Sequence, residues 1–139
     1  MTSRAVERAI IDTSVYVENF RNGRFQSELL NLPFLVRSSA VVLAELWRGV
    51  RSAESKRFVA YLERNFPAVV PTESDWTESG LIVSRLALRE TYQRRKLQEI
   101  HFDVLIALTA RRIGAFLITC NRADFTAIQK VQEFKLICW

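Results

Sequence analysis

Histidine and cysteine are scarce in this chain of 139 residues. It has one histidine, His101, and two cysteines, Cys120 and Cys138, with no CxxC spacing. A catalytic set built on histidine and a Cys/His zinc site both need more of these residues, so the composition argues against both. The two cysteines lie in apolar runs typical of strands, where a thiol serves as a small core residue. This cysteine usage does not require an oxidising compartment.

Long apolar runs are missing as well. No stretch approaches the roughly 18 consecutive apolar residues of a membrane span. The first eight residues include the charged Arg4, Glu7 and Arg8, and no apolar segment of a signal peptide follows them. We therefore expect a cytoplasmic protein with no membrane partner. With 49% hydrophobic and 25% charged residues, a chain of this length is expected to form a single domain over residues 1–139.

Short apolar runs alternate with helical patterns along the chain. This alternation predicts an α/β fold around a mainly parallel five-stranded sheet. We expect a loop or a frayed helix end over residues 90–99. The predicted strands are 8–11, 34–37, 67–70, 115–119 and 134–138, and the predicted helices begin near 15 and cover about 26–32, 39–50, 54–66, 72–89, 101–112 and 127–131.

Acidic side chains occur where the pattern predicts burial. Asp103 lies inside the apolar stretch 100–110, which contains no lysine, and no arginine either, and Glu45 lies inside the apolar helix pattern 41–50. Asp12 ends the first predicted strand. An unpaired carboxylate in an apolar core costs several kcal/mol. An exposed helix edge, a distant arginine or a helix cap explains each acid separately, whereas a shared divalent metal ion explains all three.

The expected topology brings these acids to one edge of the sheet. Asp12 follows the first strand, Asn121 and Asp124 follow a later one, and parallel strands end on the same side. The helix that carries Asp103 must run antiparallel to the strand after it, so its early residues lie over that edge, and Glu45 can face it by the same argument. Carboxylates this close raise one another's pKa, and Mg²⁺ or Mn²⁺ relieves the repulsion.

A metal ion at such a site can activate a water and neutralise charge on a phosphodiester oxygen. The basic run Arg94, Arg95 and Lys96 precedes the Asp103 helix, and it is either solvated surface or a contact for phosphates. The formal net charge of +5 favours an anionic partner, either a nucleic acid or an acidic protein segment.

Four blocks of sequence occur in order along almost the whole chain: Ile11–Ser14, Leu43–Gly49, Asp103–Ala107 and Leu117–Phe125. Together they resemble the PIN domain and, more narrowly, the VapC toxins of bacterial toxin–antitoxin pairs. The resemblance implies a PIN-like three-layer α/β/α sandwich. It also implies a Mg²⁺-dependent endoribonuclease, with Mn²⁺ as an alternative ion.

The resemblance also assigns roles to residues of this sequence. The family's metal ligands map to Asp12 and Asp103, and its helical glutamate maps to Glu45. The fourth position maps to Asn121, which is neutral, and it stays open whether Asp124 substitutes for it. The expected catalytic residues are therefore Asp12, Glu45, Asp103, Asn121 and Asp124, with hydroxyls from Thr13, Ser14 and Thr119 holding the acids or a water.

The partners implied by the family are an RNA substrate, a second copy of the chain in a homodimer, and a cognate antitoxin. A segment of the antitoxin is expected to pack across the toxin and block its site. Trp47 and Val50 fit either such an apolar groove or simple core packing.

Two other functions fit parts of the pattern. Asn121 and the basic run 94–96 also suit a catalytically weak or inactive RNA-binding module of the same fold. A phosphotransfer protein that uses Asp12 is the third alternative. It is disfavoured because Ser14 stands where aspartate phosphatases have a second Asp, and because no lysine lies close to Asp12, Glu45 or Asp103 in the sequence.

Overall fold

A five-stranded sheet forms the centre of the computed structural model, which describes residues 5–139. The strand order is β3-β2-β1-β4-β5, and every neighbouring pair is parallel. This confirms the predicted fold class. The strands are β1 (Arg8–Ile11), β2 (Leu35–Ser39), β3 (Ala68–Val69), β4 (Phe116–Thr119) and β5 (Leu136–Cys138).

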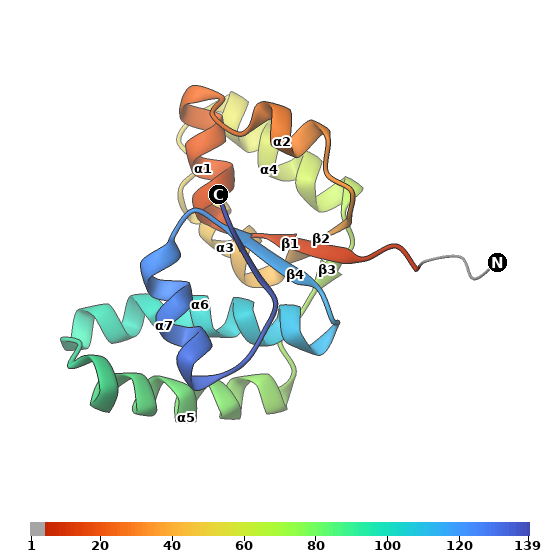
Figure 1. Cartoon of the computed structure of the whole chain (residues 1–139). Helices are drawn as coiled ribbons and strands as arrows, with labels where there is room; N and C mark the ends of the chain where they lie inside the picture. The colour runs from red at the N-terminus through yellow and green to blue at the C-terminus, as the bar shows by residue number, and fades with distance from the viewer. Residues whose placement is uncertain (1–4) are drawn as a thin grey trace.

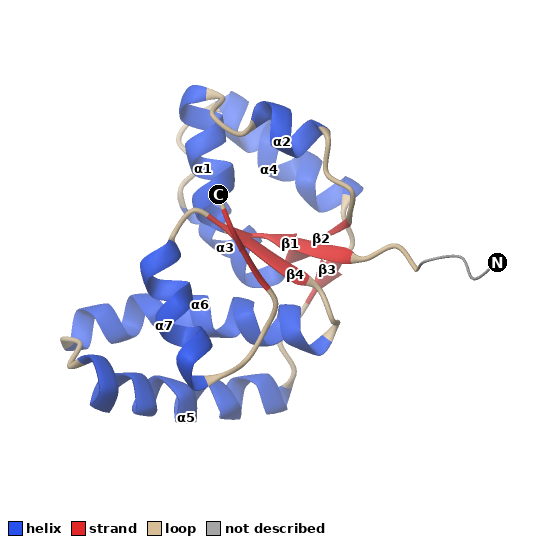
Figure 2. Ribbon diagram, in the orientation of Figure 1, coloured by secondary structure: helices blue, strands red, loops and turns tan. Residues whose placement is uncertain are grey.

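Helices cover both faces of the sheet. Helices α1, α2 and α4 lie on one side of it and α5, α6 and α7 on the other, so the molecule has three layers (Figures 1 and 2). Helix α3 follows β2 and contacts α1, α4 and α6. The helices are α1 (Thr13–Asn22), α2 (Gln26–Leu30), α3 (Ala40–Arg48), α4 (Ala53–Asn65), α5 (Glu73–Glu90), α6 (Arg94–Arg112) and α7 (Arg122–Val131).

The buried core explains why the central strands are almost purely apolar. Ala9, Ile10 and Ile11 of β1 and Leu117 and Ile118 of β4 are all at most 1% exposed. A strand with helices over both of its faces has no solvent side and therefore needs no polar alternation. The second half of α6 packs on this sheet, and its residues from 104 to 110 are all buried.

The expectation of a loop or a frayed helix end over residues 90–99 is correct only for residues 91–93 and wrong for 94–99, which are helical. Helix α5 ends at Glu90, Thr91 takes a left-handed backbone conformation (φ 53°), and α6 begins at Arg94. The first turns of α6 are polar because they extend past the core, so their hydrophobic pattern is weak. Helix α7 likewise begins at Arg122, earlier than the expected 127, because the Asn121 side chain caps it.

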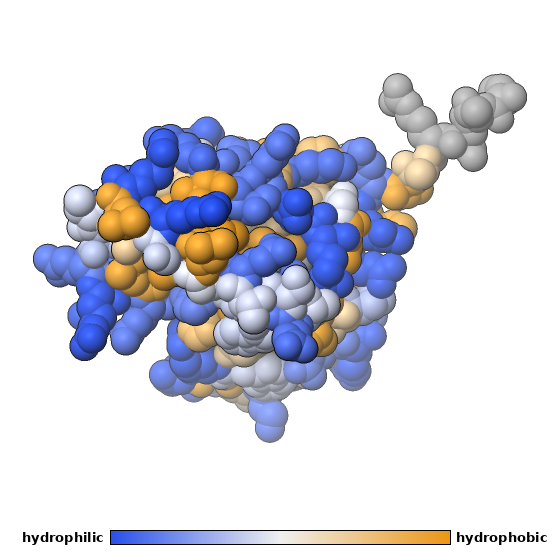
Figure 3. All heavy atoms as spheres, turned by 90° about the horizontal axis from the view of Figure 1, so that it is seen from below, coloured by the Kyte–Doolittle hydropathy of each residue, from blue (hydrophilic) through white to orange (hydrophobic). Residues whose placement is uncertain are grey.

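The outer faces carry mixed side chains. Seen from below, hydrophobic side chains lie among a larger number of hydrophilic ones (Figure 3). Trp76, Leu81 and Leu88 of α5 are among the exposed large hydrophobic residues. Within residues 5–139, no helix has the length and hydropathy needed to cross a bilayer.

Helix α3 follows β2 directly, with no loop between them. This junction sets the position of Glu45, which lies on α3. Ser39 is the last residue of β2 and also the N-cap of α3. Its buried Oγ accepts hydrogen bonds from the backbone N–H groups of Val41 (3.1 Å) and Val42 (3.3 Å). Ser38, one residue earlier, is also buried, but its Oγ makes no hydrogen bond in the described part of the chain.

We predict that Ser39→Ala lowers the free energy of unfolding by about 1 kcal/mol, because two helix N–H groups lose their acceptor. Ser38→Ala is the matched control. It should be neutral or stabilising, because it removes a buried hydroxyl that has no partner. Urea unfolding of both variants measures the difference, and a larger loss for Ser38→Ala than for Ser39→Ala would contradict the assignment of the cap.

Candidate active site

Asp12 lies at the carboxyl end of β1 and is only 3% exposed. Its Oδ2 accepts hydrogen bonds from Ser14 Oγ (2.6 Å) and Thr119 Oγ1 (2.8 Å). Burial raises the pKa of Asp12, and the two hydroxyls oppose that rise. Because β1 and β4 are parallel neighbours, Thr119 at the end of β4 stands beside Asp12 although 107 positions separate them. The side chain of Asp12 is therefore held in one orientation at the sheet edge.

Asp12 takes the N-cap position of α1, but its side chain makes no capping hydrogen bond, so a helix cap does not explain this acid. Thr13 and Ser14 lie in the first turn of the helix. Their hydroxyls bind carboxylates, Ser14 that of Asp12 and Thr13 that of Glu45.

Glu45 reaches the same edge from α3. Its Oε1 accepts a hydrogen bond from Thr13 Oγ1 at 2.8 Å. Burial and the negative charge of Asp12 raise the pKa of Glu45, while the Thr13 hydroxyl and the charge of Arg48 oppose the rise. Glu45 is therefore a carboxylate of raised basicity in a defined orientation.

Asp103, on α6, is influenced by more neighbouring carboxylates than Asp12 or Glu45. Burial, together with the negative charges of Asp12, Glu45 and Asp124, raises its pKa to about 8, and Lys96 opposes the rise only in part. Four carboxylates from β1, α3, α6 and α7 therefore share one electrostatic neighbourhood.

Asp124 has its own partners. Its Oδ2 accepts hydrogen bonds from Lys96 Nζ at 2.7 Å and from Asn121 Nδ2 at 3.0 Å. Asn121 Oδ1 accepts the backbone N–H of Asp124 at 3.4 Å, which caps α7. The Asn121 amide is thus engaged with Asp124 through both of its polar atoms.

The three residues of the basic run 94–96 have different surroundings in the structure. Lys96 is part of the acidic centre through its ion pair with Asp124. Arg95 points outward, with 91% of its side chain exposed, and pairs loosely with Glu99 at 3.5 Å. Arg94 is exposed as well. His101 is outside the centre and joins α6 to α5 through a 2.8 Å hydrogen bond between its Nε2 and Ser79 Oγ.

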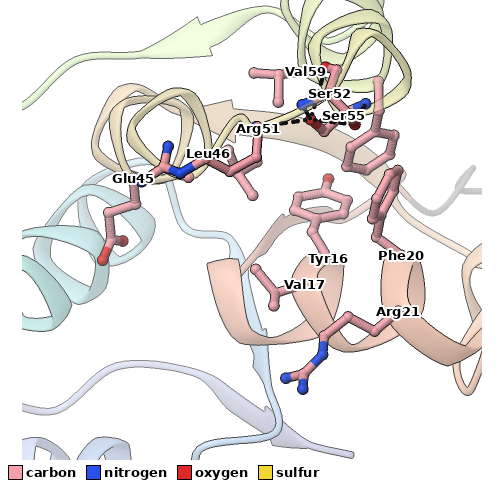
Figure 4. A pocket seen from close by; sticks show the side chains of 12 residues that line it. Tyr16, Val17, Phe20, Arg21, Glu45, Leu46, Arg51, Ser52, Ser55 and Val59 are labelled. Atoms are coloured by element: carbon pink, nitrogen blue, oxygen red, sulfur yellow. Dashed lines mark hydrogen bonds between the residues drawn. The ribbon is translucent and has the colours of Figure 1, made fainter.

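Two hollows adjoin Glu45. A shallow groove of about 270 Å³ lies between α3 and α6 and is bounded by Arg48, Arg95, Gln98, Glu99 and Phe102 as well as Glu45. A second pocket of about 280 Å³ lies between α1, α3 and α4 and is mainly apolar. Tyr16 and Phe20 lie toward one end of it and Glu45 at the other (Figure 4). Glu45 is therefore shared by both surfaces.

The donor set fits a hard divalent cation. All four acids offer carboxylate oxygens, the ligands that Mg²⁺ and Mn²⁺ prefer, and no sulfur or imidazole ligand is among them. A cation would also relieve the repulsion that raises the pKa of Asp103. Among the described residues, no three acidic, histidine or cysteine side chains stand as close together as a ready-made metal site requires. The acids are neighbours, and a cation would have to draw them closer.

Comparison with known proteins gives the family. The PIN domain family model matches residues 9–131. The chain belongs to the PIN domain family. This confirms the resemblance drawn from the four sequence blocks. The comparison with curated proteins gives no match.

Solved structures share the fold over nearly the whole chain. A chain of VapBC2 from Rickettsia felis, in a crystal structure with a DNA fragment from their promoter, has a TM-score of 0.70, 19% identity, and coverage of 95% of this chain and 98% of that one. A chain of VapBC-1 from nontypeable Haemophilus influenzae has a TM-score of 0.71 and 21% identity, with the same coverage. VapBC-5 from Mycobacterium tuberculosis, a member of the VapBC family of toxin-antitoxin systems, has a TM-score of 0.58, 19% identity and the same coverage again.

Sequence reasoning did not find the ion pair of Lys96. The polar composition of residues 94–96 indicates exposed surface or a phosphate contact, and it does not show that these residues begin α6. The signal was available in principle: Lys96 and Asp103 are seven residues apart, which puts both on one face of a continuous helix.

We predict that Asp103→Asn stabilises the metal-free protein at high pH. The raised pKa of Asp103 means that the contribution of this residue to folding stability is full below about pH 4 and is lost as the pH rises toward about 8. An asparagine removes that loss, so the free energy of unfolding of the variant should rise relative to that of the wild type, by up to about 1.4 kcal/mol per pH unit between pH 4 and pH 8. Urea unfolding in EDTA at several pH values measures this, and parallel profiles for the two proteins would contradict it.

Proposed function

We propose that this protein is a Mg²⁺-dependent endoribonuclease and the toxin of a type II toxin–antitoxin pair. The observation that carries the proposal is the meeting of Asp12, Glu45, Asp103 and Asp124 at one edge of a PIN-family fold. The VapBC assemblies that share the fold support the toxin role, and the net charge of +5 suits an RNA substrate.

In this proposal, Asp12 and Asp103 hold the cation. Asp12 is fixed for this role by the hydroxyls of Ser14 and Thr119. The cation, when bound, supplies positive charge against the charge that builds up on a phosphodiester oxygen during displacement. Mn²⁺ offers the same coordination chemistry and should replace Mg²⁺.

Glu45 is the residue best placed to accept a proton from the attacking water. Its raised pKa makes it a stronger base than an ordinary glutamate, and Thr13 fixes one of its oxygens. The exposed Arg94 and Arg95 at the start of α6 remain the proposed contacts for RNA phosphates.

We expect Asp103→Asn to lower Mg²⁺-dependent RNA cleavage by about 100-fold or more. Loss of groups that only support a metal ligand costs about 10–100-fold, and loss of a ligand should cost at least as much. The control is Glu99→Gln, one turn earlier on the same helix, with a largely exposed side chain. A cleavage assay on single-stranded RNA, with Mg²⁺ or with EDTA, measures both variants. Cleavage that persists in EDTA would refute metal dependence.

An inactive RNA-binding module is the second candidate, and the engagement of Asn121 with Asp124 favours it. In that case Asn121, at the fourth position of the family pattern, has no free side-chain atom to offer a metal ion, and the protein would bind RNA without cleaving it. RNA binding that is unaffected by Asp12→Asn, together with no cleavage in Mg²⁺, would support this second function.

We further propose that an antitoxin segment occupies the apolar pocket between α1, α3 and α4. Its lining includes Phe20, Leu46 and Phe58, and Glu45 lies at its end, so a segment bound there would reach the proposed base. Trp47 and Val50, the residues considered at first for such a groove, are not among the residues that line it. Trp47 is half-buried and donates through Nε1 to Glu63.

Phe20→Ser should weaken antitoxin binding at least about tenfold while leaving RNA cleavage intact, because it removes an exposed aromatic anchor from the pocket. Phe20 is 43% exposed and packs against Phe58 at 5.6 Å between ring centroids. Tyr61→Ser is the matched control, since Tyr61 is 49% exposed and packs against Phe66 outside the pocket. Titration with the purified antitoxin measures affinity, and equal losses in both variants would place the antitoxin elsewhere.

A further inference from the structure

Asp124 differs from Asp12, Glu45 and Asp103 because the positively charged side chain of Lys96 already pairs with its carboxylate. Lys96 Nζ and Asn121 Nδ2 both donate to its Oδ2, at 2.7 Å and 3.0 Å. Within residues 5–139, no lysine or arginine forms a salt bridge with Asp12, Glu45 or Asp103. The four carboxylates thus divide into three that lack a paired cation and one that has it.

The helix fixes the position of this cation. Lys96 lies in the first turn of α6, and Asp103 follows seven residues later on the same face, about 10 Å along the helix axis. The Lys96 ammonium also lies 5.8 Å from the ring centroid of Tyr92. The hydrogen bond to Asp124 raises the pKa of Lys96, so the ammonium stays charged at neutral pH. It is a permanent part of the centre.

The charges of the centre limit how many divalent cations it can hold. When bound metal keeps all four carboxylates ionised, these acids and one ammonium together carry three net negative charges. A single divalent cation between Asp12 and Asp103 brings that to one. A second would make the centre net positive and would have to displace Lys96 from Asp124, which means breaking a charge-assisted hydrogen bond.

We propose that Lys96 takes the place of a second metal ion, so that the centre binds one divalent cation and Asp124 is not a ligand to it. The inference rests on the proposed function, because it takes the metal site of the ribonuclease as given. Lys96 is then a positioning residue, which acts through Asp124. Asn121 helps to hold that pair and caps α7, and it is not a metal ligand either.

Metal stoichiometry tests the proposal without reference to catalysis. Mn²⁺ is titrated into the full chain by calorimetry, and electron paramagnetic resonance reports whether bound ions are coupled in pairs. We expect one ion in the wild type, two in Lys96→Met, where Asp124 is released, and one again in Lys96→Met/Asp124→Asn. Arg95→Gln, which removes the neighbouring cation on α6, should bind one Mn²⁺, as the wild type does. Two ions in the wild type, or one ion in Lys96→Met, would overturn the proposal.

The single variant Asp124→Asn keeps the test decisive if Lys96→Met does not fold, as judged by circular dichroism. With its partner removed, the Lys96 ammonium repels the cation, so one Mn²⁺ should still bind but about fivefold more weakly. The double variant should regain the wild-type affinity, whereas a ligand role for Asp124 predicts weak binding in both. No Mn²⁺ binding by the wild type would overturn the proposed metal-dependent function itself. One bound ion without RNA cleavage would overturn the ribonuclease and leave the role of Lys96 standing.

Discussion

Crowding of carboxylates that are partly or fully withdrawn from water is the constraint on which the rest of this structure depends. Asp12 follows a strand, and Glu45 and Asp103 lie on two helices. Burial raises the pKa of all three, and the negative charge of neighbouring carboxylates adds to the rise at Glu45 and Asp103. The surrounding hydroxyls oppose that effect at two of the three, where Ser14 and Thr119 hold Asp12 and Thr13 holds Glu45. Asp103 has no such hydroxyl in the described hydrogen bonds, and its pKa is raised to about 8.

The sequence was sufficient to predict the sheet and the three central acids. Apolar runs that end in a polar residue indicated β1 and β4, and a carboxylate inside an apolar helix pattern indicated Glu45 and Asp103. These signals are strong because burying a charge is costly, so a buried acid in a stable fold needs a reason. The same patterns placed all five strands in the order in which the structure has them along the chain.

Local patterns could not predict how the polar residues pair with one another. The ion pair joins Lys96 of α6 to Asp124 of α7, two residues that are 28 positions apart in the sequence. Lys96 lies in a helical turn whose polar sequence resembles a loop. The two amide contacts of Asn121 could not be foreseen either, because an asparagine after a strand fits a ligand and a helix cap equally well. Such choices are made by the tertiary structure, which sets the distances.

Glu45 connects the polar and apolar parts of the surface. It faces the other acids on one side and closes an apolar pocket on the other. Anything that fills the pocket therefore comes into contact with the residue that we assign as the base. Inhibition by such a partner needs no change in the fold, because contact alone alters the solvation of that carboxylate.

The hydrogen bond from Thr119 to Asp12 also has a consequence for biosynthesis. The aspartate is synthesised 107 positions before Thr119, whose hydroxyl holds it and which belongs to β4. A nascent or truncated polypeptide that stops before β4 lacks both this hydroxyl and the strand that pairs with β1 beside the aspartate. The centre is therefore assembled only after β4 has been synthesised, and fragments that end before β4 lack it.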